Sequence, residues 1–366
     1  MTRWRTAYFI AINTALLWVV TLVATHAGIV SYHWLKARYG PVSMPPEARA
    51  TYSGRTPAEI DQLWRDSLAL RFRYQPVVGL VQEQLTSRFF NVDKFGVRSN
   101  GGPSNPIDGS TWIFGGSTTF GIAVADAETI PAFLERRLGR AVINFAVRSH
   151  GSLHENRLLR HYLRLGYRPR QVIFLDGVNE TCDVDLDTDA LGDLVARSQQ
   201  GYQWDPAYPV VYAARTLGSR IGTAVYPPID PPASEEVSCR LAGAAFPLSA
   251  MTRRLLAERD ALCALYEVTC QTFVQPFGGL HGHDTEPGFR ETTHAEHMRA
   301  LFEHLEPVWK DASAIFVTNA LDALPEHPYI DAEHYSVAGH RAIADAIAIH
   351  LATSAVAGRA SSAAEP

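Results

Sequence analysis

The chain has 366 residues, of which 46% are hydrophobic and 19% are charged, and its formal net charge at pH 7 is −5. This is ordinary globular composition, long enough for one large domain or two modest ones. The mild negative charge provides no basic face of the kind that nucleic-acid-binding proteins carry, so we expect no nucleic-acid partner. No internal repeat is visible.

The N-terminal segment is predominantly apolar from Ala7 to about Val30 and contains no Asp, Glu, Lys or Arg. Its length meets the roughly 20 residues that a helix needs to cross a bilayer. Aromatic residues flank it, as they flank membrane spans: Trp4, Tyr8, Tyr32 and Trp34. We predict that residues 1–35 form an uncleaved single-pass membrane anchor and that the domain after it is extracytoplasmic, in the periplasm if the chain is bacterial. The alternatives are a cleaved signal peptide, with a poor cleavage site at 25–27, and a buried core helix.

Residues 36–108 contain proline-rich and polar pieces. They predict an irregular approach segment that packs on the main domain, with one helical stretch near 57–71.

From residue 109 onwards, short apolar stretches alternate with helical patterns. Five short stretches are predominantly apolar, which is typical of strands buried on both faces of a parallel sheet: 111–114, 141–147, 171–175, 269–275 and 314–318. Helical periodicity occurs between them: 129–138, 153–165, 251–266 and 337–351. The alternation predicts an α/β doubly wound domain over 109–352.

Two parts of the chain depart from this alternation. Residues 183–247 include Tyr-Pro-Pro-Ile-Asp-Pro-Pro at 226–232 and predict an insertion, which could be a lid over the site or a surface excursion without a role in binding. The tail at 353–366 consists mainly of small residues and predicts disorder.

Polar residues follow the predicted strands, at the sheet edge where doubly wound folds bind ligands. Ser117 follows the first strand in Gly-Gly-Ser-Thr-Thr-Phe-Gly at 115–121, Ser149 the second, and Asn179 the third. Asp331 and His334 come after the fifth strand, before the last helix. Convergence of these groups would assemble an acyl-transfer site, with Ser117 as nucleophile, His334 as its base and Asp331 holding the imidazole.

An oxyanion in such a reaction needs hydrogen-bond donors. We expect them to be the backbone N–H of Ser117, the backbone N–H of Ser149 and the side-chain amide of Asn179. Asp176 is expected to fix the loop that carries Asn179, and Glu180 to pair locally.

These four segments, in this order, resemble the SGNH (GDSL-type) serine hydrolase family: 115–121, 144–151, 176–180 and 331–334. The resemblance covers about 109–351, with the insertion outside it. It implies a three-layer α/β/α fold with a five-stranded parallel sheet, no cofactor, and ester hydrolysis or acyl transfer. Membrane-anchored relatives often act on acyl groups of cell-surface polysaccharide, so the resemblance implies an O-acetylated glycan as substrate.

The chain departs from the family pattern at two positions. The family usually has Asp before the serine, where this chain has Gly116. The oxyanion glycine of the second segment aligns with Ser149, whose N–H can donate if its φ is negative; Gly151 is the alternative donor.

Several histidines and cysteines leave alternatives open. A cluster at His281, His283, His294 and His297 could bind a metal, although a polar loop before a helix is the preferred interpretation. His150 and His154 could contact substrate or lie exposed at a helix start. The four cysteines allow a Cys182–Cys239 disulfide that would hold the insertion over the site, or a Cys263–Cys270 disulfide, and the spacing does not decide.

We therefore expect a serine esterase that cleaves O-acyl esters, most simply O-acetyl esters on cell-envelope carbohydrate. An O-acyltransferase would use the same three residues. A non-catalytic glycan-binding or assembly protein that keeps the fold, and a metal-dependent hydrolase using the histidine cluster, are the other hypotheses.

Overall fold

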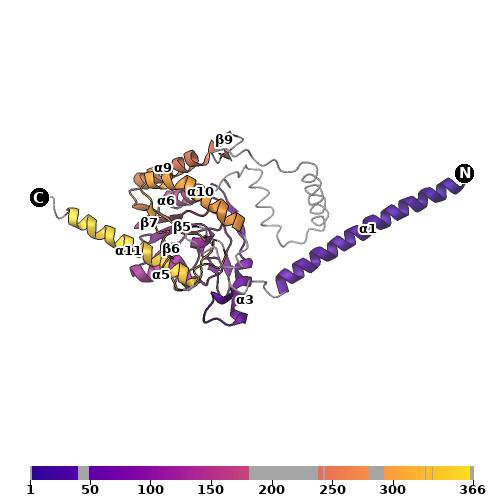
Figure 1. The fold of residues 1–366 in the computed structure, drawn as a ribbon, viewed down its shortest axis with the longest axis horizontal. Coiled ribbons are helices and arrows are strands. Elements are labelled where there is room, and N and C mark those ends of the chain that lie inside the picture. The colour runs from indigo at the N-terminus through magenta and orange to yellow at the C-terminus, as the bar shows by residue number, and fades with distance from the viewer. Residues whose placement is uncertain are drawn as a thin grey trace. The chain divides into compact units, whose positions relative to one another are not determined.

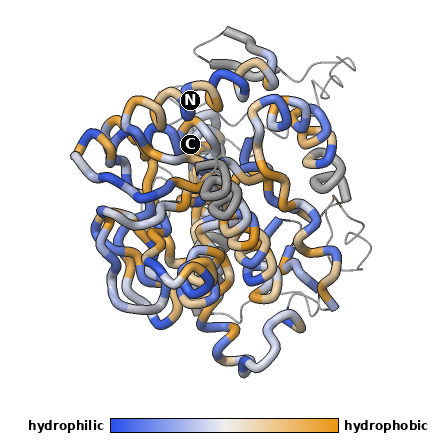
Figure 2. Tube along the Cα trace, turned by 90° about the vertical axis from the view of Figure 1, so that its left-hand side faces the viewer, coloured by the Kyte–Doolittle hydropathy of each residue, from blue (hydrophilic) through white to orange (hydrophobic). Residues whose placement is uncertain are grey.

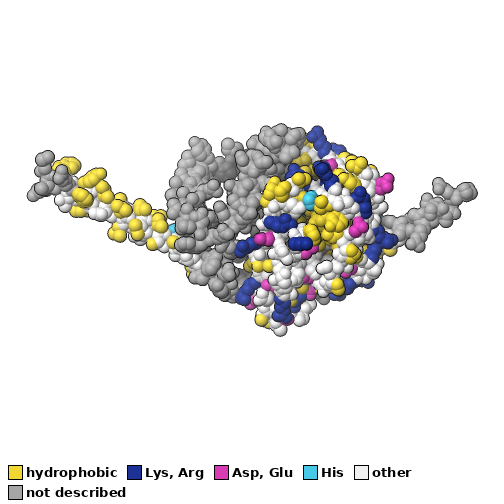
Figure 3. Space-filling view, turned by 180° about the vertical axis from the view of Figure 1, so that it is seen from behind, with side chains coloured by type: hydrophobic (Ala, Val, Ile, Leu, Met, Phe, Trp, Pro, Cys, Tyr) yellow, Lys and Arg dark blue, Asp and Glu magenta, His cyan; other side chains and the backbone are white. Residues whose placement is uncertain are grey.

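The computed structural model describes residues 2–39, 49–180, 238–241, 244–278, 280, 292–325, 327–331 and 333–362. The chain divides into two compact units, Met1–Ser43 with Gln199–Glu235, and Met44–Ser198 with Glu236–Pro366. The described part of the first unit is helix α1 (Thr2–Tyr39), which continues past the predicted boundary at residue 35. Hydrophobic side chains line much of this helix (Figure 3). Its Thr6–Gly28 stretch is long and apolar enough to cross a membrane, a property that signal sequences share.

The second unit contains the predicted five-stranded parallel sheet. The strand order β11-β10-β7-β5-β6 is that of a doubly wound sheet, with the first strand in chain order next to the second and third. Every described pairing in this sheet is parallel. The five predicted strands are all present, with shorter bounds at several ends: β5 (Thr111–Gly115), β6 (Val142–Asn144), β7 (Gln171–Asp176), β10 (Cys270–Val274) and β11 (Ile315–Phe316).

Successive side chains of each central strand enter different cores, because a strand alternates its faces. In β5, Trp112 and Phe114 pack with helix α6 (Ser152–Arg164) and helix α9 (Leu248–Leu265). Ile113 packs with α5 (Ile130–Leu138) and α11 (Val337–Ser362) on the other face. Figure 1 shows the helices on the two sides of the strands, and Figure 2 shows the hydrophobic residues concentrated toward the middle of the domain. The result is the expected three-layer α/β/α sandwich.

One helix outside the predicted set covers the same face as α9. Helix α10 (Thr292–Asp311) contributes Leu301, Leu305 and Trp309 to a core that also contains Leu256 of α9. The preferred interpretation of the histidine cluster placed a helix start in this region.

The approach segment is more regular than its composition predicts. Helix α3 (Pro57–Leu68) begins at Thr56, whose hydroxyl accepts from the Glu59 N–H while the Glu59 carboxylate accepts from the Thr56 N–H. The predicted helix near 57–71 is thus present, but the expectation that the rest of the segment is irregular was wrong. Two short antiparallel pairs follow the helix: β1 (Phe72–Gln75) with β2 (Gly79–Gln82), and β3 (Leu85–Thr86) with β4 (Asn91–Val92). Strands of two to four residues are too short to show a periodicity in the sequence.

Buried Arg98 joins the approach segment to the chain just after Ser117. Its guanidinium donates to the backbone oxygens of Phe120, Gly121 and Val124 and to the Asp126 carboxylate. The approach segment therefore fixes the position of the turn that follows β5.

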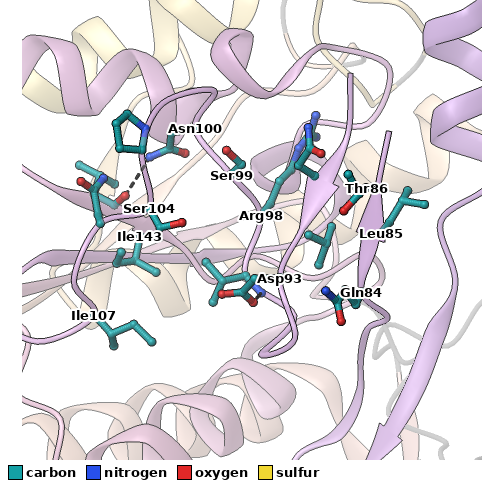
Figure 4. Close-up of a pocket in the computed structure, with 16 residues that line it drawn as sticks. Gln84, Leu85, Thr86, Asp93, Arg98, Ser99, Asn100, Ser104, Ile107 and Ile143 are labelled. Carbon is teal, nitrogen blue, oxygen red and sulfur yellow. Dashed lines mark hydrogen bonds between the residues drawn. The ribbon is translucent and has the colours of Figure 1, made fainter. Parts of the chain in front are cut away.

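A cavity of about 320 Å³ with a mixed polar and apolar lining lies between this segment and strand β6 (Figure 4). Asn100 lines it and donates from Nδ2 to the backbone oxygen of Val142 at 2.8 Å, which ties the segment to the edge of the sheet. None of the predicted site residues lines this cavity.

Two further predictions concern the ends of the large domain. The tail was predicted to be disordered from residue 353, but α11 continues to Ser362, since its alanine-rich sequence favours helix. A disulfide joins Cys263 and Cys270. The Cys182–Cys239 pairing and most of the 183–247 insertion lie outside the described residues, apart from the hairpin of β8 (Ser238–Leu241) and β9 (Ala244–Pro247).

Candidate active site

The four predicted segments lie where the parallel strands end. Ser117 follows β5, Ser149 follows β6, Asn179 follows β7, and His334 lies between β11 and α11. Because these strands are parallel, their carboxyl ends share one edge of the sheet. The structure brings Ser117, His334 and Asp331 into direct contact, and it places Asn179 against Gly116.

Two glycines present Ser117 at the end of β5. Ser117 begins the one-turn helix α4 (Ser117–Phe120), and Gly121 ends it in the left-handed conformation with φ 86°. A Cβ atom on Gly115 would lie 2.1 Å from Thr119 Oγ1, so a side chain there would force this turn open. Ser117 itself is 8% exposed. The local sequence thus forms a tight strand-to-helix turn that carries one hydroxyl.

The imidazole of His334 connects Ser117 to Asp331. His334 Nε2 lies 2.8 Å from Ser117 Oγ, and His334 Nδ1 lies 2.8 Å from Asp331 Oδ2. Both distances are within ordinary hydrogen-bond range. With the proton on Nδ1 donated to the carboxylate, Nε2 is free to accept the hydroxyl proton of Ser117.

A short loop builds the Asp331–His334 pair locally. Asp331 Oδ1 accepts the backbone N–H groups of Glu333 at 2.9 Å and His334 at 2.7 Å. The loop closes where the Ile330 N–H donates to the His334 carbonyl oxygen at 2.7 Å. An Asp that accepts N–H groups two and three residues later is a common turn former, so the spacing of three residues places carboxylate and imidazole together.

The pair perturbs the titration of both members. Burial lowers the pKa of His334, but the charge and hydrogen bond of Asp331 outweigh it, so the net pKa is raised above its ordinary value. Burial raises the pKa of Asp331, but the charge and hydrogen bonds of His334 outweigh it and lower the net pKa. An imidazole beside a carboxylate is a stronger base and its protonated form is stabilised, as a serine-activating base requires.

Asn179 lies against the turn that carries Ser117. A Cβ atom on Gly116 would lie 1.6 Å from Asn179 Nδ2, so any side chain at residue 116 would displace the amide. Residue 116 is therefore glycine in a place where this structure has no room for a side chain. Asn179 Nδ2 donates one hydrogen to the His150 carbonyl oxygen at 2.9 Å, and an amide nitrogen has a second hydrogen to donate.

The backbone around Ser149 differs from the expectation. Ser149 has φ 62°, so the negative φ that was set as the condition for its N–H to donate is not met. The residue adopts the left-handed conformation that a glycine would adopt without cost, and that costs other residues about 1–2 kcal/mol. A Cβ atom on Gly151 would lie 2.7 Å from the Asn179 carbonyl oxygen, so this position also requires glycine. The Ser149 N–H as oxyanion donor stays a prediction, with Gly151 as its alternative.

His150 and His154 belong to the interior, so the expectation that they lie exposed was wrong. Both are less than 9% exposed, and their rings stack with centroids 5.0 Å apart. His150 Nε2 lies 2.6 Å from the Leu80 carbonyl oxygen. Burial lowers the pKa of His150 to about 3 and that of His154 to about 4.

A buried charged cluster behind the Asn179 loop contains a residue that the sequence pattern did not single out. Carboxylate oxygens of Glu155, Asp176 and Glu180 lie within 4.8 Å of one another, and Arg259 donates to the first two. A lone arginine in a helical pattern gives no signal of this role. The side chains of the predicted histidine cluster (His281, His283, His294 and His297) lie outside the described residues.

No protein-family model and no curated protein matches the chain. Among solved structures, it is similar to Est24, a carbohydrate acetylesterase from Sinorhizobium meliloti, at 15% identity and a TM-score of 0.33, over 67% of this chain and 99% of that one. It is also similar to a catalytic mutant of Axe2, an acetylxylan esterase from Geobacillus stearothermophilus, at 15% identity and a TM-score of 0.34, over 66% and 94%.

A third similar structure is the C-terminal catalytic domain of peptidoglycan O-acetyltransferase A from Streptococcus pneumoniae, at 14% identity and a TM-score of 0.32, over 68% of this chain and 95% of that one. Likenesses at these scores are too distant to assign an activity. The five-stranded parallel sheet and the helical layers on its two faces are the features that the resemblance in the sequence implied. The chain has a three-layer α/β/α fold with a five-stranded parallel sheet, which is the architecture that the sequence resemblance to SGNH (GDSL-type) serine hydrolases implied.

Proposed function

We propose that the protein is a serine esterase of the SGNH type that cleaves O-acyl esters through an acyl-enzyme on Ser117. The observation that carries this proposal is the continuous contact from Ser117 Oγ through His334 to Asp331, with both joining distances at 2.8 Å. A hydroxyl is a weak nucleophile until a base removes its proton, and this arrangement supplies the base and its orienting acid.

In the proposed reaction, Ser117 Oγ attacks the ester carbonyl carbon while His334 Nε2 takes the hydroxyl proton. Asp331 stabilises the imidazolium that forms. The imidazolium then donates this proton to the departing sugar or alcohol oxygen, and the ester C–O bond breaks. A second nucleophile, activated by the same imidazole, releases the acyl group from Ser117.

The oxyanion of the tetrahedral intermediate would be stabilised by the Asn179 amide and by the Ser117 N–H. Ser117 is the first residue of α4, and the first N–H groups of a helix have no acceptor within that helix. The backbone N–H of Ser149 or Gly151 completes the proposed set. Donors held in place before the reaction stabilise the developing charge without reorganisation.

The proposed substrate is an O-acetyl ester on cell-envelope carbohydrate, with α1 holding the domain at the outer face of a membrane. The apolar Thr6–Gly28 stretch supports the membrane location, and a tethered enzyme meets envelope glycans and lipids first. Hydrolysis and transfer to a glycan hydroxyl share every step up to the acyl-enzyme, so water and sugar acceptors compete for the same intermediate.

The test offers an acetylated sugar ester to the purified chain, with and without a glycan acceptor, and follows the acetyl group. We expect free acetate without the acceptor, and no turnover by the Ser117→Ala variant. Acetylated acceptor in place of acetate would identify a transferase with the same site. Binding of acetylated glycan without turnover would contradict both and favour the glycan-binding hypothesis.

A further inference from the structure

We propose that Arg259 is a positioning residue for the oxyanion side of the active site, because it holds in place the loop that carries Asn179. This inference rests on the proposed function. Arg259 does not reach Ser117, so any effect on the reaction must pass through the segments it binds.

The Arg259 guanidinium joins two elements that end at the site. Nη1 donates to Asp176 Oδ2 at 2.8 Å, and Nη2 donates to Glu155 Oε2 at 3.0 Å. Asp176 is the last residue of β7, and Glu155 lies in the first turn of α6. One side chain from α9 therefore fixes the end of a strand against the start of a helix.

These two elements are also the ones that meet at Asn179. Asn179 follows Asp176 by three residues, and its amide donates to the His150 carbonyl oxygen, just before α6 begins. The Glu155 N–H in turn donates to the Gly151 carbonyl oxygen at 3.1 Å. A change in the spacing that Arg259 sets would move the Asn179 amide relative to the Ser117 turn.

The surroundings of the Arg259 side chain fit a guanidinium group. Arg259 is 1% exposed and its Cζ lies 3.7 Å from the centroid of the Phe174 ring. Its remaining hydrogen bonds go from Nε to Asn156 Oδ1 at 3.2 Å and from Nη1 to Thr272 Oγ1 at 2.9 Å. A lysine keeps the charge but has neither the planar fork nor the reach to bind all four partners at once.

The charges of the cluster make this arginine necessary. Asp176 and Glu155 are each 1% exposed, and an unpaired buried carboxylate is costly. Burial, followed by the charge of Asp176, raises the pKa of Glu155 well above its usual value and that of Glu180 to about 8. The ion pair of Arg259 with Asp176 is therefore the dominant charge interaction behind the loop.

The experiment is a double-mutant cycle between Arg259 and Asn179, measured with an acetyl ester. We expect Arg259→Lys to lower kcat by about 10–100-fold, the range for small misplacement of a reacting group, with KM nearly unchanged. In the Asn179→Ala background, Arg259→Lys should lower kcat by less than about threefold, because the amide that it would misplace is absent. Arg253→Lys on the same helix is the matched control, since that side chain is 59% exposed, and it should leave kcat unchanged.

If Arg259→Lys lowered kcat by the same factor in the wild-type and Asn179→Ala backgrounds, or lowered it in neither, the inference would be overturned. The proposed function would remain in place. Wild-type protein without Ser117-dependent turnover would overturn the proposed function and the inference with it. If Arg259→Lys does not fold, Glu155→Gln replaces it in the cycle. Glu155→Gln changes one hydrogen-bond partner of Arg259 but keeps the contact of Arg259 with Asp176, and the same non-additivity is expected.

Discussion

The two sides of the candidate site are built in different ways. On one side, Asp331 and His334 are three residues apart and meet within one loop, where the Asp331 side chain is 49% exposed. On the other side, Asn179 depends on a buried cluster in which Arg259 binds residues that precede it by 83 and 104 positions.

The difference shows that local contacts position one part of the site and long-range contacts position the other. The loop that carries the base is shaped by its own sequence, through the N–H groups that Asp331 accepts. The oxyanion side is shaped by the packing of α9 and α6 against β7. Changes on the base side should therefore affect the chemistry with little effect on folding, whereas changes in the cluster should affect both.

The largest effect is expected on the base side. Ser117→Ala and His334→Ala should each lower kcat by roughly 10⁴-fold or more, because residues that act as one unit lose most of their effect when any is removed. Ester hydrolysis checks the rate, and urea unfolding should show little change in stability. His161→Ala, in the last turn of α6 away from the site edge, is the matched histidine control. Activity retained in Ser117→Ala would contradict the assignment.

Asp331→Asn tests the contact between Asp331 and His334 on the base side of the site. It should lower kcat by about 10⁴-fold, because the amide neither holds the tautomer of His334 nor stabilises the imidazolium. In the wild type, Asp331 raises the pKa of His334, so kcat/KM should fall on the acid side with a midpoint above about 6.5. A pH–rate profile measures this midpoint.

Asp345→Asn is the matched control for that substitution, since Asp345 binds exposed Arg137 on the outer side of α11. A wild-type midpoint below 6.5 would contradict the role of Asp331.

Asn179→Ala tests the oxyanion side directly. We expect kcat to fall by roughly 10²–10³-fold with a small change in KM, since the lost donor acts on charge that develops in the transition state. Steady-state kinetics on an acetyl ester separate the two constants. Wild-type kcat in this variant would remove Asn179 from the oxyanion hole.

Gly116→Ala tests the contact between the two sides. Its Cβ would lie 1.6 Å from Asn179 Nδ2, so the amide must move, and we expect kcat to fall by about 10–100-fold. Gly102→Ala is the control, because a Cβ there has no neighbour within 4 Å. If Gly116→Ala retained full activity, the Asn179 amide would not need its observed position.

The last prediction concerns stability in mild acid and not the reaction. His150, His154 and His340 are buried, and burial lowers their pKa values to about 3, about 4 and about 3. They favour the folded state only while neutral, so their contribution is complete above about pH 6.5 and is lost as pH falls towards the folded values. At pH 5 each should reduce the free energy of unfolding by about 2 kcal/mol. Urea unfolding at pH 7 and pH 5 measures this, and equal stability at both would contradict it.

Local patterns in the sequence predict much of this molecule. The five strands are short and mostly apolar, so each could be placed, and the Asp331–His334 spacing forms its turn through local contacts. Ser117 could be identified because two glycines and the end of β5 mark it.

The remaining features depend on contacts between segments far apart in the chain. Nothing near Arg259 indicates that it binds Asp176, and the short pairs of the approach segment have too few residues for a visible alternation. The left-handed φ of Ser149 could not be predicted, because a serine in the sequence does not indicate a positive φ. A glycine at the same position would have indicated it. The alanine-rich end of α11 was predicted as a tail because small residues fit both disorder and helix.

The central claim is that His334 activates Ser117 as a nucleophile. Its most direct test is to treat the folded protein with a fluorophosphonate and locate the adduct by peptide mass spectrometry. We predict one adduct, on Ser117, that is lost in Ser117→Ala and forms far more slowly in His334→Ala. Folded wild-type protein that forms no adduct on Ser117, or one whose rate does not depend on His334, would contradict the account.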